Sequence, residues 1–337
     1  MMDADTGAVL FEKQADRRSL IASTTKIMTA IVVLEHCDPD CEFIIPPEAA
    51  NIEGSSIYLK AGEALTIRDL LYGMMLHSGN DAAIALALAC SGSVEEFVVL
   101  MNLKAQSLGM SNSSFENPNG LDGEAHYSTA RDLAVLTAYA LKNPLFREIV
   151  STKQYRCGER CFTNHNKLLW SVEGAIGVKT GYTKAAGRIL VSAAERNGRR
   201  LIVVTVNDGN DWLDHTGLYD YGFSLYQERE VVQLRMPVTK IPLMDGTEAT
   251  LLAGDSVSLY ASDAEQVTLR LLYPRQAFSA GIPGTFAGSA AVYLGERRIA
   301  TIRLLWGKTE EFYEAETAKN PVRARNCLPT RGGAADC

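Results

Sequence analysis

The spacing of apolar residues changes character once along the chain, near residue 230. Before that point, apolar residues recur at helical spacing in several long segments, and beyond it they occur only in short alternating runs. Segment 27–34, Ile-Met-Thr-Ala-Ile-Val-Val-Leu, is apolar nearly all round, which predicts a buried helix. Further helices are predicted over about 67–77, 81–90, 93–109, 129–141 and 212–230.

Short β-rich segments complete the first part of the chain. One strand ends at Lys179-Thr180-Gly181, and two more are predicted over 188–194 and 201–206, joined by Asn197-Gly198. Because Asn-Gly between two β-rich runs is a strong hairpin signal, these three segments are expected to be antiparallel neighbours. Residues 1–11 are predicted to form two short strands about an Asp-Thr-Gly turn.

This pattern predicts two domains. Residues 1–230 are expected to form an α/β (α+β) domain with an antiparallel sheet between helices, and residues 231–312 a small all-β domain. Between them, residues 227–230 are polar and are interpreted as a linker. The tail, 313–337, is also polar and is expected to be loosely ordered.

The head of the buried helix carries the first candidate for chemistry. Ser23 and Lys26 are three residues apart, so on a helix they share one face, with Cβ atoms about 5–6 Å apart. Burial favours a neutral lysine that can take the serine proton, and a helix N-terminus also favours an oxyanion. However, Ser-x-x-Lys arises roughly once by chance in a chain of this length, and a plain N-cap explains Ser23 equally well.

Two tripeptides follow the Ser-x-x-Lys motif along the chain, and their presence makes a chance occurrence of the whole set less plausible. Ser78-Gly79-Asn80 occupies the junction between two predicted helices, and Lys179-Thr180-Gly181 ends a predicted strand. Each is expected by chance in roughly one chain in ten of this size. Together with Ser-x-x-Lys, they form the signature of the acyl-transferring penicillin-binding proteins and class A β-lactamases.

Over nearly all of residues 2–310, the chain resembles low-molecular-mass penicillin-binding proteins of the D-alanyl-D-alanine carboxypeptidase type. The resemblance implies a penicillin-binding-protein/β-lactamase-like catalytic domain followed by a β domain. Besides the three motifs, it rests on MDADTG at 2–7, EGSS at 53–56, NPNGL at 117–121, HYSTA at 126–130 and GVKTGYT at 177–183.

The resemblance also implies a role for each motif residue. Ser23 is the expected nucleophile and Lys26 its general base. Ser78 and Lys179 are expected to form a proton-relay pair on the opposite side of the site, with Asn80 holding the substrate amide. Two lysines that converge on one pocket lower each other's pKa, so one can be neutral while the other stays cationic.

The strand that carries the third motif is expected to bind the substrate. The terminal carboxylate of the substrate would bind at Lys179 and Thr180. Backbone N–H groups of Ser23 and Tyr182 would form the oxyanion hole. Gly181 would let the peptide approach the strand edge and add to it as a further strand. Arg188 is the nearest candidate in sequence for another carboxylate contact.

The implied reaction releases the last D-alanine of a peptidoglycan stem peptide ending in D-Ala-D-Ala, through an ester on Ser23. β-Lactam antibiotics would acylate the same serine, and neither a metal nor an organic cofactor is expected. The implied physiological roles are peptidoglycan synthesis and cell shape. The net charge of −7, without a long basic run, argues against a nucleic-acid partner.

Three alternative functions are compared with the carboxypeptidase. A D,D-endopeptidase that cuts peptide cross-links would use the same side chains. A serine β-lactamase needs a deacylating water, but the Glu-x-x-Leu-Asn signature is missing between Asn80 and Lys179, and Glu116 stands beside Asn117-Pro118 instead. An inactive wall-binding module is disfavoured because every motif side chain is intact.

The sequence has neither a leader peptide nor an apolar stretch of about 18 residues that would span a membrane. Family members are exported and begin with a leader and a complete first strand, so we expect an extracytoplasmic, cell-envelope protein given in shortened form. Many members end in an amphipathic helix on the membrane. The polar tail lacks that apolar stripe, so membrane anchoring is not evident.

Seven cysteines include two close pairs, Cys37 with Cys41 and Cys157 with Cys161, each across a predicted turn. Local disulfides would suit an exported protein, while free thiols, or metal binding with a nearby histidine, are the alternatives. At least one pair is expected to be disulfide-bonded in oxidised protein. Cys90, at the end of an apolar helix, is interpreted as a buried small hydrophobe.

Overall fold

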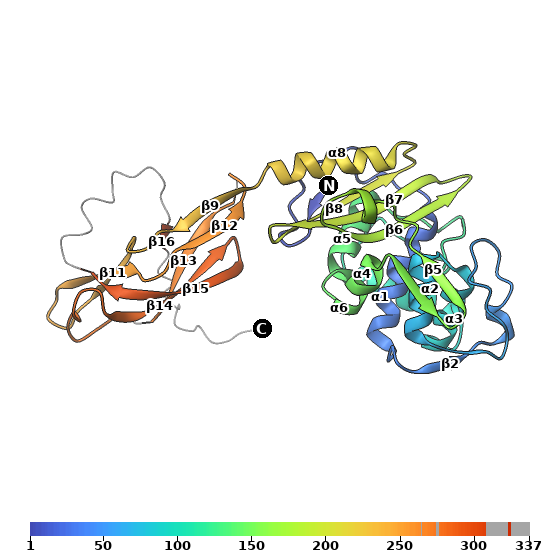
Figure 1. The fold of residues 1–337 in the computed structure, drawn as a ribbon, viewed down its shortest axis with the longest axis horizontal. Coiled ribbons are helices and arrows are strands. Elements are labelled where there is room, and N and C mark those ends of the chain that lie inside the picture. The colour runs from blue at the N-terminus through green and yellow to red at the C-terminus, as the bar shows by residue number, and fades with distance from the viewer. Residues whose placement is uncertain (264, 274–275, 308–322, 325–337) are drawn as a thin grey trace, which may run out of the picture. The chain divides into compact units, whose positions relative to one another are not determined.

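The computed structural model describes residues 1–263, 265–273, 276–307 and 323–324. The chain forms two compact units, one spanning Met1–Phe223 and one that begins at Ser224 (Figure 1). Each unit has a hydrophobic core of its own. The expected boundary after residue 230 lies a few residues further along than this division.

A four-stranded antiparallel sheet organises the first unit, with the strand order β1-β8-β7-β6. β6 (Ala175–Thr183) is one edge, β7 (Gly187–Arg196) follows it, and β8 (Arg199–Val206) comes next. β7 and β8 are joined by the Asn197-Gly198 turn, so the predicted hairpin is confirmed. Of the hairpin predicted within residues 1–11, only the Met2–Val9 bridge forms. The prediction is otherwise wrong, because β1 (Met2–Asp3) pairs with β8.

Helices lie on both faces of this sheet (Figure 1). α8 (Asp211–Ser224) covers one face, where the Tyr219 hydroxyl lies 2.5 Å from Ser192 Oγ of β7. The neighbouring β7 residues Val191 and Ala193 point to the opposite face and join the main core. Because successive strand side chains alternate between faces, β7 contributes to both layers. The predicted sheet between helices is confirmed.

The main core surrounds α1, which is buried from its first residue to Val33, as its apolar sequence predicts. Thr66 and Ser93 cap the helices that follow them: Thr66 accepts a hydrogen bond from Asp69 N–H, and Ser93 accepts one from Glu96 N–H. The helices other than α8 are α1 (Lys26–His36), α2 (Ile67–Leu76), α3 (Asn80–Ser91), α4 (Val94–Ser107), α5 (Ala130–Ala140), α6 (Pro144–Ser151) and α7 (Leu168–Ser171).

Shorter elements fill the connections of this unit. Two of them are the 3₁₀ helices η1 (Ala22–Thr25) and η2 (Pro47–Ala49). The others are two small hairpins, β2 (Glu42–Ile44) with β3 (Ala64–Thr66) and β4 (Gln154–Cys157) with β5 (Arg160–Thr163).

The second unit is built from strands, as predicted. One sheet has the order β10-β11-β15-β14-β13-β16, and β9 pairs with β12. Two of its strands form a hairpin across Gly295-Glu296. The strands are β9 (Gln227–Val232), β10 (Pro237–Pro242), β11 (Glu248–Ala253), β12 (Val257–Ala261), β13 (Val267–Tyr273), β14 (Phe286–Leu294), β15 (Arg297–Trp306) and β16 (Arg323–Ala324).

The linker predicted at the start of this unit is wrong. Residues 227–230 are part of β9, and the next strand, β10, starts at Pro237. The polar residues of β9 were misleading because this strand belongs to a two-stranded ribbon on which most of them stay exposed. The polar tail expected over 313–337 lies outside the described residues, apart from β16, which pairs in parallel with β13.

Among the described helices, none is by itself long and apolar enough to cross a membrane. α3 and α4 together have the required length and composition, but they are bent by 86° at the break between them.

Asp81, at the start of α3, fastens segment 56–59 to that helix. Its carboxylate is fully buried and accepts hydrogen bonds from the N–H groups of Ile57 and Leu59 and from the Ser56 hydroxyl, at 2.6–3.1 Å. Charge-assisted hydrogen bonds at a helix N-terminus are strong ones. The Asp81 carboxylate therefore holds segment 56–59, which precedes α2, against α3, which follows α2.

We predict that Asp81→Ala lowers the free energy of unfolding by about 3 kcal/mol, because it leaves several buried donors without an acceptor. Asp81→Asn retains the shape and one acceptor oxygen and should cost less. Urea unfolding of both variants beside the wild type measures the difference. Identical midpoints for the wild type and Asp81→Ala would show that the network contributes nothing.

Candidate active site

The three sequence motifs meet at the head of α1. Ser23 lies in η1 immediately before this helix, Ser78 and Asn80 come from the α2–α3 junction, and Lys179 comes from β6. The Lys179 ammonium nitrogen lies 3.1 Å from Ser78 Oγ, and Lys26 Nζ lies 2.7 Å from Asn80 Oδ1. The structure thus brings together five of the residues that the sequence singled out.

Lys26 is fully buried, and its amine has three polar neighbours. Nζ lies 2.9 Å from Ser23 Oγ, 2.7 Å from Asn80 Oδ1 and 2.5 Å from the backbone oxygen of Asn119. Burial lowers the pKa of Lys26 well below its usual value, and the nearby Lys179 lowers it further, although Asp81 opposes the shift. The amine is therefore biased toward its neutral form.

The identity of these neighbours decides what a neutral Lys26 can do. A neutral amine has two N–H donors and one lone pair. The oxygens of Asn80 and Asn119 can only accept, so they take the two N–H groups. The Ser23 hydroxyl is the neighbour of the three that can donate, and the lone pair therefore faces the serine proton.

Lys179 occupies the other side of the junction and is buried to 1% exposure. Its Nζ donates to Ser78 Oγ at 3.1 Å and to the Thr180 carbonyl at 2.9 Å. Burial lowers the pKa of Lys179 to about 7. Ser78 itself has φ of 64°, a left-handed conformation that is uncommon outside glycine, and it turns the chain between α2 and α3.

Backbone groups of segment 53–55 hold Asn80. Its Nδ2 donates to the Glu53 carbonyl at 2.6 Å, and its N–H donates to the Ser55 carbonyl at 2.7 Å. A Cβ on Gly54, whose φ is 92°, would lie 2.6 Å from Asn80 Nδ2. Glycine is therefore needed where this segment crosses the asparagine. The amide oxygen is thereby aimed at Lys26.

β6 lies beside η1, and Gly181 of β6 allows the two backbones to come close together. A Cβ at this position would lie 3.2 Å from both the Ile21 carbonyl oxygen and the Thr24 nitrogen. The glycine thus lets the strand pack against the backbone that carries Ser23, a reason that the sequence alone did not suggest. The flanking Tyr182 is 65% exposed, and Thr180 is half-buried, so both border solvent.

Sequence reasoning gave no role to two contacts made by the loop after α4. Gly120 passes so close to η1 that a Cβ would lie 2.0 Å from the Ala22 carbonyl oxygen, and this brings the Asn119 carbonyl to Lys26. His126 Nε2 lies 2.7 Å from Thr25 Oγ1. Both belong to stretches that resemble the family, but a backbone acceptor leaves no signal in a sequence.

His126 is a neutral side chain that links η1 to the loop after α4. Its Nδ1 accepts a hydrogen bond from Glu116 N–H at 3.1 Å, so in the neutral ring the proton lies on Nε2 and points to Thr25. Burial lowers the pKa of His126 to about 4. The ring therefore fixes η1 without bringing a positive charge near Lys26 at neutral pH.

Arg188 is held by an acidic partner. Its guanidinium donates to both carboxylate oxygens of Asp211, at 2.5 and 3.1 Å, and it lies over the Trp212 ring. In the sheet, Arg188 faces Tyr182 of β6. A role in binding the substrate carboxylate stays a prediction for this residue.

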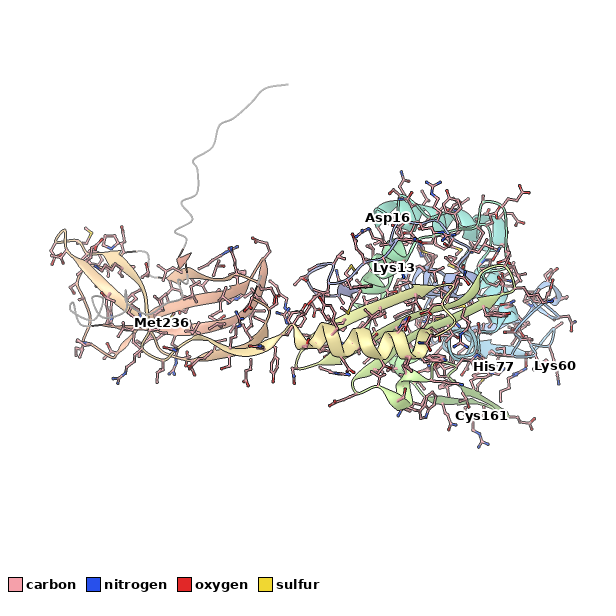
Figure 2. All side chains as sticks on the ribbon, turned by 90° about the horizontal axis from the view of Figure 1, so that it is seen from above. Lys13, Asp16, Lys60, His77, Cys161 and Met236 are labelled. Atoms are coloured by element: carbon pink, nitrogen blue, oxygen red, sulfur yellow. The ribbon has the colours of Figure 1, made fainter. Side chains whose placement is uncertain are left out.

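The two cysteine pairs carry free thiols. In the β4–β5 hairpin, Cys157 pairs with Arg160 and is buried, whereas Cys161 pairs with Arg156 and is exposed (Figure 2 labels Cys161), so the two cysteines point to opposite faces. Strand alternation therefore opposes a bond between them. Cys37 ends α1 and is partly exposed, whereas Cys41 lies on the surface. Within the described part of the chain, no three His, Cys, Asp or Glu side chains gather as a metal site.

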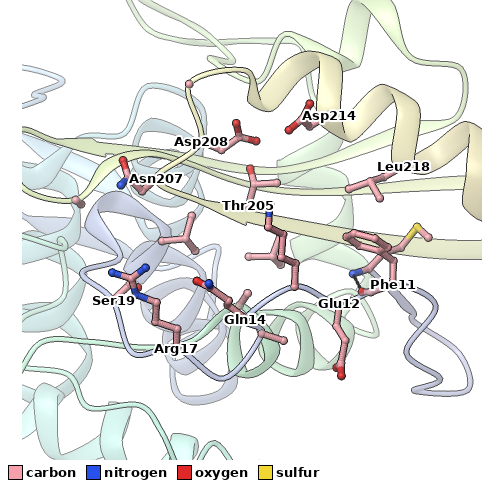
Figure 3. Close-up of a pocket in the computed structure, with 18 of the residues that line it drawn as sticks. Phe11, Glu12, Gln14, Arg17, Ser19, Thr205, Asn207, Asp208, Asp214 and Leu218 are labelled. Atoms are coloured by element: carbon pink, nitrogen blue, oxygen red, sulfur yellow. Dashed lines mark hydrogen bonds between the residues drawn. The ribbon is translucent and has the colours of Figure 1, made fainter.

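A hollow of the first unit lies apart from these residues. It has a volume of about 860 Å³ and lies along β8 and α8, where Phe11, Arg17, Thr205, Asn207 and Leu218 line it (Figure 3). None of the motif residues borders it. The convergence of the two lysines, and not this hollow, identifies the candidate active site.

Comparison with known proteins identifies the class. Residues 1–210 match the family described as D-alanyl-D-alanine carboxypeptidase, and the chain belongs to this family. It is 34% identical over 284 residues to D-alanyl-D-alanine carboxypeptidase DacF of Bacillus subtilis (strain 168), covering 79% of this chain and 72% of that one. It is 33% identical over 293 residues to DacC of Escherichia coli (strain K12), covering 81% and 73%.

Solved structures agree with this membership. Penicillin binding protein 5 from Haemophilus influenzae has a TM-score of 0.66 and 28% identity, covering 91% of this chain and 94% of that one. The Streptomyces K15 DD-transpeptidase has a TM-score of 0.65 and 37% identity, covering 66% and 95%. The predicted family and fold class are confirmed.

We predict that Lys26→Ala slows acylation of the protein by benzylpenicillin by about 10²–10⁴-fold, the usual contribution of a positioned base. Stopped-flow measurement of acylation gives the rate, and circular dichroism checks that the variant remains folded. Lys60→Ala is the matched control, because this lysine is exposed (Figure 2). A wild-type rate in Lys26→Ala would place the base elsewhere.

Proposed function

We propose that this protein is a serine D-Ala-D-Ala carboxypeptidase that releases the terminal D-alanine of peptidoglycan stem peptides. The carrying observation is the 2.9 Å contact between Ser23 Oγ and a buried Lys26 whose other two neighbours can only accept hydrogen bonds. Its family membership supports the same activity.

In the proposed reaction, Ser23 Oγ attacks the carbonyl of the bond between the two D-alanines. Lys26 takes the serine proton as the new C–O bond forms. Backbone N–H groups of Ser23 and Tyr182 receive the oxyanion. The proton held by Lys26 passes through Ser78, which is hydrogen-bonded to Lys179, to the D-alanine amine, so the amine leaves protonated and Lys26 is neutral again.

Hydrolysis of the ester completes the cycle. Water attacks the Ser23 ester with Lys26 again as the base, and the shortened peptide leaves. Asn80 is proposed to hold the substrate amide through its side chain, which already touches the base. No step requires a metal or an organic cofactor. A β-lactam enters the same sequence at the acylation step and stays bound as an ester.

The substrate carboxylate is proposed to bind at Lys179 and Thr180. Below its pKa of about 7, Lys179 carries the positive charge that pairs with an anion, and binding of a carboxylate would itself raise that pKa. Gly181 and Tyr182 continue the same edge strand, along which the peptide backbone would add.

We further propose an extracytoplasmic location in the cell envelope, with roles in peptidoglycan synthesis and cell shape. Peptidoglycan is the implied partner, and no nucleic-acid partner is proposed for a chain with a net charge of −7. Membrane anchoring forms no part of the proposal.

The acyl acceptor defines the second candidate function. A relative from Streptomyces K15, 37% identical over 249 residues, is named D-alanyl-D-alanine carboxypeptidase, and a structure from the same strain is titled DD-transpeptidase. An amine in place of water would give transpeptidation from the same Ser23 ester. A D,D-endopeptidase would differ instead in the acyl donor, which would be a cross-linked peptide.

We predict that a pentapeptide ending in D-Ala-D-Ala loses its last residue, while its C-terminal amide reacts much more slowly. The reason is that the carboxylate makes charge-assisted contacts, which are roughly twice as strong as neutral ones. Chromatography of the products measures both rates, with added glycine as the amine acceptor in a parallel reaction. Faster cleavage of a cross-linked dimer than of the pentapeptide would favour the endopeptidase.

A further inference from the structure

The helices α1 and α3 run side by side in the same direction and touch at both ends. At their N-terminal ends, Lys26 Nζ donates to Asn80 Oδ1 at 2.7 Å. At their C-terminal ends, Cys37, which ends α1, meets Cys90 in the last turn of α3. With a rise of 1.5 Å per residue, the two helices span about 16 Å and 15 Å between these contacts, so the lengths agree.

The side chains of Cys37 and Cys90 are hydrogen-bond partners. Cys90 donates a hydrogen bond to Cys37, which lowers the pKa of the Cys37 thiol, and the same hydrogen bond together with burial raises the pKa of Cys90. Both side chains are partly exposed and also pack on the edge of the main core. Cys37 is thus the more readily ionised of the pair, and solvent reaches it.

We propose that Cys37 and Cys90 form a redox-modification site, at which thiol–disulfide exchange joins the C-terminal ends of α1 and α3 by a disulfide. This pairing differs from the local Cys37–Cys41 pair, one of the two pairs that the sequence offered. The geometry favours it because the Cys90 thiol is already hydrogen-bonded to Cys37, whereas Cys41 lies beyond a turn on the surface.

The chemistry needs an external disulfide, such as oxidised glutathione or the disulfide of an oxidoreductase. The Cys37 thiolate attacks one of its sulfurs and releases one thiolate. The Cys90 thiol loses its proton and attacks the mixed disulfide at the Cys37 sulfur, which releases the second thiol. Two protein thiols are oxidised, and one external disulfide is reduced to two thiols.

The bond would close a loop that contains segment 53–55, the α2–α3 junction and Ser78. Constraining a loop of this length restricts the unfolded chain and therefore stabilises the folded one. It would also fix the far ends of the two helices whose near ends carry Lys26 and Asn80. The effect should be on stability rather than on the acylation chemistry, because the thiols lie about 15 Å along the helices from Lys26.

The test oxidises the full chain with oxidised glutathione, alkylates the remaining thiols in denaturant and digests with trypsin. We expect a disulfide between peptides 27–60 and 69–104, which reduction with dithiothreitol removes. Because 27–60 contains both Cys37 and Cys41, the assignment comes from variants. The cross-link should persist in Cys41→Ser and disappear in Cys37→Ser and in Cys90→Ser.

Thermal unfolding supplies the second measurement. Oxidation should raise the midpoint of the wild type and of Cys41→Ser by at least about 4 °C, and should leave that of Cys90→Ser unchanged. The benzylpenicillin acylation rate should stay within about twofold, a readout that separates this site from the catalytic one. A cross-link from Cys37 to any other cysteine, or free Cys37 and Cys90 after oxidation, would overturn the proposal.

Discussion

The burial of the Lys26 amine against two carbonyl oxygens is the interaction on which the catalytic unit depends. An ammonium in this position would lose its hydration, so burial lowers the lysine pKa. The oxygens of Asn80 and Asn119 satisfy the two N–H groups that remain, and Ser23 is left opposite the lone pair. Desolvation and hydrogen-bond complementarity thus produce a base from a residue that is normally an acid.

Much of the surrounding structure serves to bring those two oxygens to the lysine. The Glu53 carbonyl orients the Asn80 amide, and Asp81 fastens the preceding loop to α3. Gly120 lets the loop after α4 approach η1, and His126 ties the same loop to Thr25. These contacts join segments that are distant in sequence, so the site forms only when the whole unit is folded.

The sequence predicted those features that side-chain identity determines locally. The apolar segment of α1, the caps at Thr66 and Ser93, the Asn197-Gly198 turn and the three motifs all carry their own signals. Contacts through backbone carbonyls, such as that of Asn119, could not be predicted because any residue type supplies the same acceptor. Similarly, proximity in sequence pointed to Cys41 as a neighbour of Cys37, whereas the packing of α1 against α3 makes Cys90 its hydrogen-bond partner.

Mapping the benzylpenicillin adduct tests the central claim, that Ser23 is the nucleophile of this site, most directly. The protein is incubated with the antibiotic, and its mass is measured before and after digestion with trypsin. The account predicts one added benzylpenicillin per chain, located on peptide 19–26 and absent from Ser23→Ala. Hydrolysis of the antibiotic without a lasting adduct, or an adduct that persists in Ser23→Ala, would contradict it.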